Sequence, residues 1–188
     1  MLKRFTTQQL IFLTIMGAVM FVVDWFIASP LTAATGISGI GGMVSTLFWA
    51  TAVAFGALVV RKFGSFTLMH FIYGFLTIFA PITFLPSIFK VVLFTLMGLV
   101  TDLIVLAFKY SKVGYYTSLI LGHIFFFVGA FLLYTLLGIP TTSQIEGAEY
   151  LIVVIPLVTL VACGFGVLFG YVLYNKFKSR GAIKQLQD

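Results

Sequence analysis

Residues 115–138 read YYTSLILGHIFFFVGAFLLYTLLG, an apolar run that contains no Asp, Glu, Lys or Arg. About 20 such residues in an α-helix cross the hydrocarbon core of a bilayer. The whole chain has the same character, because 61% of its 188 residues are hydrophobic and 9% are charged, with a mean hydropathy of +1.17. A soluble domain has roughly 25% charged residues. The composition therefore predicts an all-α integral membrane protein.

Six apolar stretches of this kind predict a single membrane domain, a six-transmembrane-helix bundle that covers residues 1–188. The expected spans are 9–28, 43–60, 65–80, 88–108, 115–138 and 150–174. The third is the shortest and contains His70. The first exceeds the roughly 7–15 apolar residues of a signal peptide, so we expect it to be retained as a span.

Basic residues predict the orientation of the bundle. If the spans alternate, all but one of the 11 Lys and Arg residues fall on the same side, and Lys90 falls on the other. Because cytoplasmic connections carry an excess of Lys and Arg, we expect both termini in the cytoplasm and the protein in the cell membrane. The net charge of +6 then reflects topology and contact with the lipid bilayer, and nucleic acid is not an expected partner.

The predicted outer connections are rich in Gly and Pro. Residues 28–42 are uncharged and include Pro30 and several glycines. Irregular backbone at membrane depth is tolerated where it lines a cavity, so we expect residues 28–42 to form a lid over the outer half of the bundle. An ordinary solvent-exposed loop is the alternative.

The sequence lacks the motifs of common catalytic, nucleotide and metal sites. There is no G-x-x-x-x-G-K-[ST] and no H-E-x-x-H, and Cys163 is the single cysteine. A P-loop and a zinc site are therefore not predicted. We expect no catalytic residue, no metal and no cofactor, and we predict binding or transport in place of catalysis.

Ionisable side chains inside membrane spans are costly and mark functional sites. Asp24 is predicted near the outer end of the first span, facing a ligand or water. Lys90 opens the fourth span, where a lysine and a helix N-terminus together favour an anionic group; the alternative is snorkelling to the outer headgroups. His123, in the fifth span, is predicted to be either a hydrogen-bonded packing residue or a ligand contact.

Aromatic and acidic residues extend the predicted binding site into the last outer connection. Tyr134 and Tyr150 flank a segment that contains Glu146, and they suit either stacking on a ring-shaped ligand or an interfacial aromatic belt. The predicted substrate-binding residues are Lys90, Asp24, Tyr134, Glu146, Tyr150 and His123.

Two further patterns predict contacts between helices. Asp102 lies twelve residues after Lys90, about 18 Å along a helix, so we expect it to pair with Lys109 or Arg61 instead of with Lys90. Small residues at four-residue spacing predict close helix packing, either within the protein or against a partner. These residues are Ala50, Ala54, Ala162, Gly166 and Gly170.

One segment of about forty residues has a recognisable pattern. From Arg61 the chain reads Arg-Lys-Phe-Gly-Ser-Phe-Thr-Leu, then Tyr73-Gly74, Leu85-Pro86, Lys90 and Gly98-Leu99-x-x-Asp102. This pattern resembles the substrate-binding S components of energy-coupling factor (ECF) vitamin transporters, in their thiamin-precursor-like and archaeal groups. The family often carries A-x-x-x-A in the first span as a docking face, and Thr14-x-x-x-Ala18 departs from it here, which leaves the docking surface open.

The resemblance implies a six-helix subunit without ATPase activity. Such a subunit captures a small water-soluble vitamin or precursor beneath the loop after the first span, here residues 28–42. A transmembrane T component and two cytosolic ATPases are the implied partners. Two other hypotheses stay open at this point: an intramembrane enzyme that uses Asp24, Asp102 and His123 on a lipid, and an assembly protein without a ligand.

Overall fold

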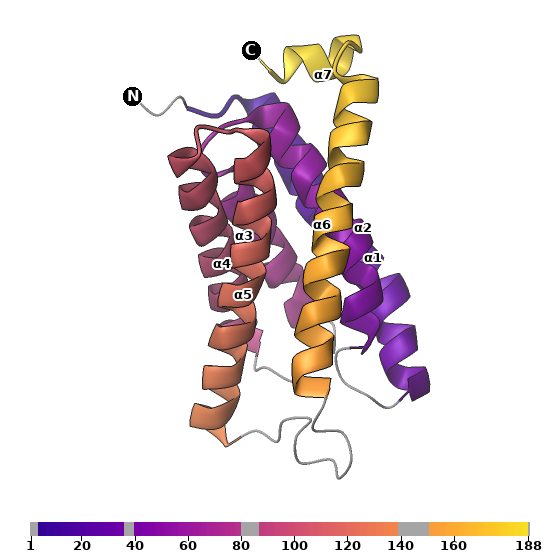
Figure 1. The fold of residues 1–188 in the computed structure, drawn as a ribbon. Helices are drawn as coiled ribbons and strands as arrows, with labels where there is room; N and C mark the ends of the chain where they lie inside the picture. Colours follow the sequence, from indigo (N-terminus) through magenta and orange to yellow (C-terminus); the bar gives the residue numbers. More distant parts are fainter. Residues whose placement is uncertain (1–3, 36–39, 80–86, 139–150, 188) are drawn as a thin grey trace.

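The computed structural model describes residues 4–35, 40–79, 87–138 and 151–187 (Figure 1). Its helices are α1 (Thr7–Thr35), α2 (Ile40–Val60), α3 (Ser65–Leu76), the 3-10 turn η1 (Thr77–Phe79), α4 (Ser87–Ala107), α5 (Lys112–Leu137), α6 (Leu151–Phe177) and α7 (Gly181–Gln185). In this described part of the chain, five helices are long and apolar enough to cross a membrane, namely α1, α2, α4, α5 and α6. The chain is therefore a helical, multi-pass membrane protein.

The third predicted span, 65–80, is shorter than a full membrane crossing. α3 and η1 together cover Ser65–Phe79, about 22 Å of helix, whereas the hydrocarbon core is about 30 Å thick. The segment packs against α4 and α1. Helix length therefore establishes five complete spans among the described residues and does not establish a sixth.

The prediction that residues 28–42 form an outer loop is wrong. α1 continues to Thr35, with Pro30 inside it, and α2 begins at Ile40. A proline removes one backbone hydrogen bond, yet the apolar residues that follow have adequate helix propensity and the helix continues. The ends of α1 and α2 also touch directly, because a Cβ on Gly41 would lie 2.0 Å from the Ala28 carbonyl oxygen. Only residues 36–39 remain of the proposed lid, and they lie outside the described residues.

Small residues bring α6 against α2. A Cβ on Gly166 would lie 2.6 Å from the Ala50 Cβ, and a Cβ on Gly170 would lie 2.7 Å from the Ala54 Cβ. The two helix backbones therefore approach more closely than larger side chains allow. These four small residues serve packing within the protein, and they are not a free docking stripe.

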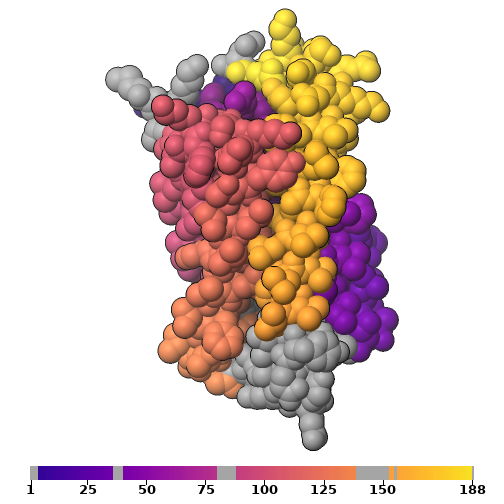
Figure 2. Space-filling view, in the orientation of Figure 1, coloured from indigo at the N-terminus to yellow at the C-terminus, as the bar shows by residue number. Residues whose placement is uncertain are grey.

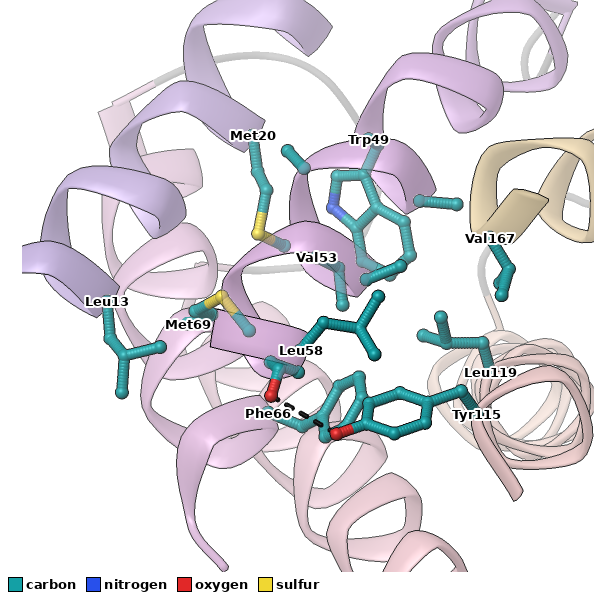
Figure 3. Packing of buried hydrophobic residues seen from close by; sticks show 14 of the residues in the cluster. Leu13, Met20, Trp49, Val53, Leu58, Phe66, Met69, Tyr115, Leu119 and Val167 are labelled. Carbon is teal, nitrogen blue, oxygen red and sulfur yellow. Dashed lines mark hydrogen bonds between the residues drawn. The ribbon is translucent and has the colours of Figure 1, made fainter. Parts of the chain in front are cut away.

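The centre of the bundle is filled by side chains from several helices. Figure 3 shows Leu13 and Met20 of α1, Trp49, Val53 and Leu58 of α2, Phe66 and Met69 of α3, Tyr115 and Leu119 of α5, and Val167 of α6. Large apolar side chains are also exposed along the outer faces of the long helices, as at Phe26, which is 72% exposed. A bundle that is apolar both inside and outside is expected when lipid is the solvent.

The basic segments meet at one end of the bundle, the upper end in Figure 1. The Lys62 amine donates to Gln9 Oε1 at 2.8 Å, and Gln9 Nε2 donates to the Leu186 carbonyl at 2.8 Å. The Arg61 guanidinium donates to the Tyr110 carbonyl at 3.2 Å. The start of α1, the α2–α3 and α4–α5 turns and the segment after α7 therefore lie together, which we call the basic end.

Candidate functional site

A group of polar and aromatic side chains lies inside the bundle between α1, α2, α3 and α5. We define the central cluster as Asp24, Ser45, Trp49, His70, Tyr73 and His123. Each of these side chains is at most 6% exposed. Polar groups surrounded by a lipid-facing bundle are unfavourable unless they bond to one another or to a ligand. The central cluster is therefore the candidate site.

Asp24 of α1 accepts a hydrogen bond from a hydroxyl group of another helix. The Tyr73 hydroxyl of α3 donates to Asp24 Oδ2. Ser45 of α2 is near the same carboxyl group, and its hydroxyl donates to the Gly42 carbonyl at 3.3 Å. α1 extends well beyond Asp24, to Thr35. Asp24 therefore lies deeper in the span than predicted, and the alternative of a carboxyl group that faces water is wrong, because this carboxyl group is buried in the bundle.

Trp49 of α2 lies at the centre of the aromatic contacts. Its ring meets those of His70, His123 and Tyr73 edge to face, with centroid distances of 5.1, 4.9 and 6.2 Å. Figure 3 shows the indole between the α1 and α6 sides of the bundle. Its buried Nε1 has no hydrogen-bond partner in the described part of the chain. Trp49 thus links α2 to α3 and α5 and keeps an unused donor.

The two histidines use the same ring nitrogen. His70 Nδ1 lies 2.7 Å from the Phe66 carbonyl oxygen, and His123 Nδ1 lies 2.9 Å from the Leu119 carbonyl oxygen. Because a carbonyl oxygen only accepts, Nδ1 carries the proton in both, and Nε2 of a neutral ring keeps a lone pair. His70 Nε2 is buried without a partner among the described residues. The cluster therefore holds a fixed acceptor here as well as the Trp49 donor.

These two unsatisfied atoms carry an energetic penalty. A buried donor or acceptor without a partner costs about 1–3 kcal/mol. Buried polar atoms in native structures usually have a partner, so an exception calls for a ligand, a water or a functional reason. Trp49 and His70 are therefore the residues of the cluster best suited to contact a bound molecule.

Lys90 of α4 lies beyond the cluster, toward the end of the bundle opposite the basic end. Its side chain is 4% exposed, and its amine donates to the Thr77 carbonyl at 3.3 Å. Thr77 follows Tyr73 by one helical turn. The amine therefore points toward α3, whereas a snorkelling lysine extends outward to the headgroups.

Asp102 does not pair with Lys109 or Arg61, and that prediction was wrong. Its carboxylate accepts hydrogen bonds from the backbone N–H groups of Phe66 and Thr67 at 3.3 and 2.8 Å, and from the Thr67 hydroxyl at 2.7 Å. The first N–H groups of a helix have no partner within it, and they favour a negative charge. Asp102 therefore caps α3 from the neighbouring helix.

The segment Arg61–Asp102, which carries the resemblance, fixes α3 against α4. A Cβ on Gly98 would lie 2.8 Å from the Phe66 carbonyl oxygen, so the two backbones are in close contact. Lys90 and Asp102 bind opposite ends of α3 and its extension η1, which agrees with their predicted separation. The pattern thus positions the helix that supplies His70 and Tyr73.

The other predicted residues lie elsewhere. Tyr134 is partly buried in a separate group with Leu93 and Ala130. It follows His123 by eleven residues, about 16 Å along α5. Glu146 and Tyr150 lie outside the described residues. Of the predicted set, the structure brings Asp24 and His123 to the central cluster and places Lys90 next to it.

Ser45, Trp49, His70 and Tyr73 were missed as site residues by the sequence analysis. For α3 a signal existed, because His70, Tyr73 and Thr77 follow one another at spacings of three and four. Residues at this spacing share one helix face, and a polar face in an apolar helix points inward. Trp49 gave no such signal, since tryptophan is also common at membrane interfaces.

Among the described residues, no group of three or more His, Cys, Asp or Glu side chains is arranged to hold a metal ion. Comparison with known proteins found no matching family model, no matching curated protein and no matching solved structure. Function is therefore inferred from the central cluster and from the resemblance of residues 61–102.

Proposed function

We propose that this chain is the substrate-capture subunit of an ECF-type importer in the cell membrane. In this proposal α3 completes a six-helix bundle, both termini are cytoplasmic, and the ligand is a small water-soluble vitamin or precursor. A T component and two cytosolic ATPases deliver the cargo. The observation that carries the proposal is the central cluster, a set of buried polar and aromatic side chains from four helices with a donor and an acceptor left unsatisfied.

Buried polar side chains lie on both sides of the cluster, but those toward the basic end already bond within the protein, as Asp102 and Ser118 do. On the outer side they continue through Thr77 to Lys90. Toward the basic end the bundle is filled by Leu58, Phe66 and Tyr115 (Figure 3). The unsatisfied atoms of the cluster, with Lys90 on its outer side, support a binding site reached from the outside.

The side chains of the cluster favour a particular ligand chemistry. The ligand offers an acceptor to Trp49 Nε1–H and a donor to His70 Nε2, and a second donor or a positive charge suits Asp24. A planar ring suits contact with the aromatic side chains. Lys90 suits an anionic or electron-rich group at the outer end of the same ligand.

Ligand-dependent thermal stabilisation of the purified protein tests the proposal. A ligand at one hundred times its Kd stabilises the native state by about 2.7 kcal/mol, so one member of a panel of B vitamins and precursors should raise Tm by several degrees. Asp24→Asn and Tyr73→Phe should weaken that response. A panel without any stabilising compound would count against a capture subunit for this ligand class.

A second candidate is an intramembrane enzyme acting on a lipid. It is favoured by one observation, the presence of Asp24 and His123 in the same cluster, although Asp102 is excluded from that group by its bonds to α3. An enzyme of this kind would form product over time from an added lipid substrate. A capture subunit would return its ligand unchanged, and an assembly protein would bind none.

A further inference from the structure

A groove runs between α5 and α6 on the outer surface of the bundle. It has a volume of about 220 Å³ and is lined by Tyr116, Val161, Gly164, Phe165 and Leu168. The two helices lie side by side on the face shown in Figure 2. A Cβ on Gly164 would meet nothing within 4 Å, so this glycine leaves the floor of the groove open. The groove is apolar and faces the region that lipid occupies.

The groove begins close to the basic end. Tyr116 stacks on Tyr171 of α6, with ring centroids 6.3 Å apart. One turn before Tyr116, the Lys112 amine lies 5.8 Å from the centroid of the Tyr171 ring. The amine of α5 therefore reaches across to α6 at the head of the groove. From Leu168 to Val161 the floor continues about 10 Å along α6 into the membrane.

The lysine at the head of the groove lacks a carboxylate partner in the described part of the chain. The carboxylates described are Asp24 and Asp102, and both are buried inside the bundle. Lys112 is exposed at the start of α5, with Lys109 three residues before it. Positive side chains between membrane helices at the cytoplasmic boundary suit anionic lipid headgroups.

We propose that this groove binds one acyl chain of an anionic phospholipid, with the headgroup phosphate at Lys112. The apolar floor matches the chain, and the amine at the head of the groove matches the phosphate charge. The site is separate from the central cluster, because it opens on the outer surface of α5 and α6. The inference is therefore independent of the ligand that the cluster binds.

Native mass spectrometry in a neutral detergent tests this site with two defined lipids, dioleoylphosphatidylglycerol and dioleoylphosphatidylcholine. We expect the wild-type protein to retain the anionic lipid selectively. Lys112→Gln should lower the affinity for that lipid about fivefold, which is the factor expected for one lysine near an anionic surface. Gly164→Leu should fill the groove and reduce retention of the anionic lipid without unfolding the protein.

Matched controls separate this site from general lipid contact. Lys184→Gln removes an exposed charge from α7, and Gly42→Leu adds a side chain at the other end of the bundle, where a Cβ also meets nothing within 4 Å. Both should leave lipid retention unchanged. Thermal stabilisation with glycerophosphate, which has no acyl chain, should be absent.

Several results would overturn the proposal. They are equal retention of the two lipids by the wild type, unchanged affinity in Lys112→Gln or Gly164→Leu, and full stabilisation by glycerophosphate alone. A dimer that forms without lipid and is abolished by Gly164→Leu would also overturn it, because it would assign the groove to a second protein chain.

Discussion

Removing the Asp102 carboxylate is expected to detach the start of α3 from α4. Asp102→Ala eliminates three hydrogen bonds and leaves two backbone N–H groups and the Thr67 hydroxyl without their acceptor. Hydrogen bonds to a charged group contribute about 1.5–3 kcal/mol each, and they are not additive when one carboxylate accepts all of them. We therefore expect a loss of about 3–5 kcal/mol in the free energy of unfolding.

Two milder changes give a graded series. Asp102→Asn keeps one acceptor oxygen and should cost about half as much, and Thr67→Val removes one side-chain donor and should cost about 1 kcal/mol. Leu103→Ala is the control, because Leu103 is the neighbour of Asp102 on α4 and is 50% exposed. Its effect should stay near 0.5 kcal/mol.

Equilibrium unfolding of the purified protein in detergent micelles, followed by circular dichroism, measures these differences. The expected order of destabilisation is Asp102→Ala, then Asp102→Asn, then Thr67→Val. A free energy of unfolding for Asp102→Ala within about 1 kcal/mol of the wild-type value would refute the capping role. An effect of Leu103→Ala as large as that of Asp102→Ala would refute it too.

Three further predictions concern packing, the outer lysine and topology. Gly170→Val should lower the free energy of unfolding by about 1–3 kcal/mol through a clash with Ala54, whereas Gly164→Val should have little effect on unfolding in the same assay. Lys90→Ala should weaken binding of the ligand identified by the stabilisation screen by about 2–5 kcal/mol, as measured by calorimetry. An unchanged affinity would exclude Lys90 from the site. Reporter fusions at both termini should give cytoplasmic signals, and an external signal from either would contradict the proposed orientation.

The helices could be predicted from hydropathy, and the bounds of α2, α4, α5 and α6 lie within three residues of the predicted ones, but the end of α1 could not be predicted. Five of the apolar stretches correspond to long helices because every backbone polar group in lipid must bond within its own segment. Residues 28–35 were read as a loop because Pro30 and the following glycines are typical of loops. In the structure these residues continue α1, and α2 packs on α1 there, because Gly41 places the two backbones in contact.

Single residues of the site could be predicted, but the way in which they group together could not. Asp24, Lys90 and His123 stood out because polar groups are rare in membrane spans. Their partners depend on which helices are neighbours, and one sequence does not contain that information. The same limit explains why the partners of Asp102 were predicted wrongly, because its acceptor role requires the start of α3 to lie beside α4.

The fluorescence of Trp49 tests the central claim most directly, because this residue lies in the cluster and the chain has only one other tryptophan, Trp25. Trp25→Phe leaves Trp49 as the single emitter, and Trp49→Phe leaves the half-exposed Trp25 as the control. A ligand from the stabilisation screen should change Trp49 emission saturably, with a midpoint that shifts to higher concentration in Tyr73→Phe, and should leave Trp25 emission constant. Saturable binding with constant Trp49 emission and unchanged affinity in Tyr73→Phe would contradict a binding site at the central cluster.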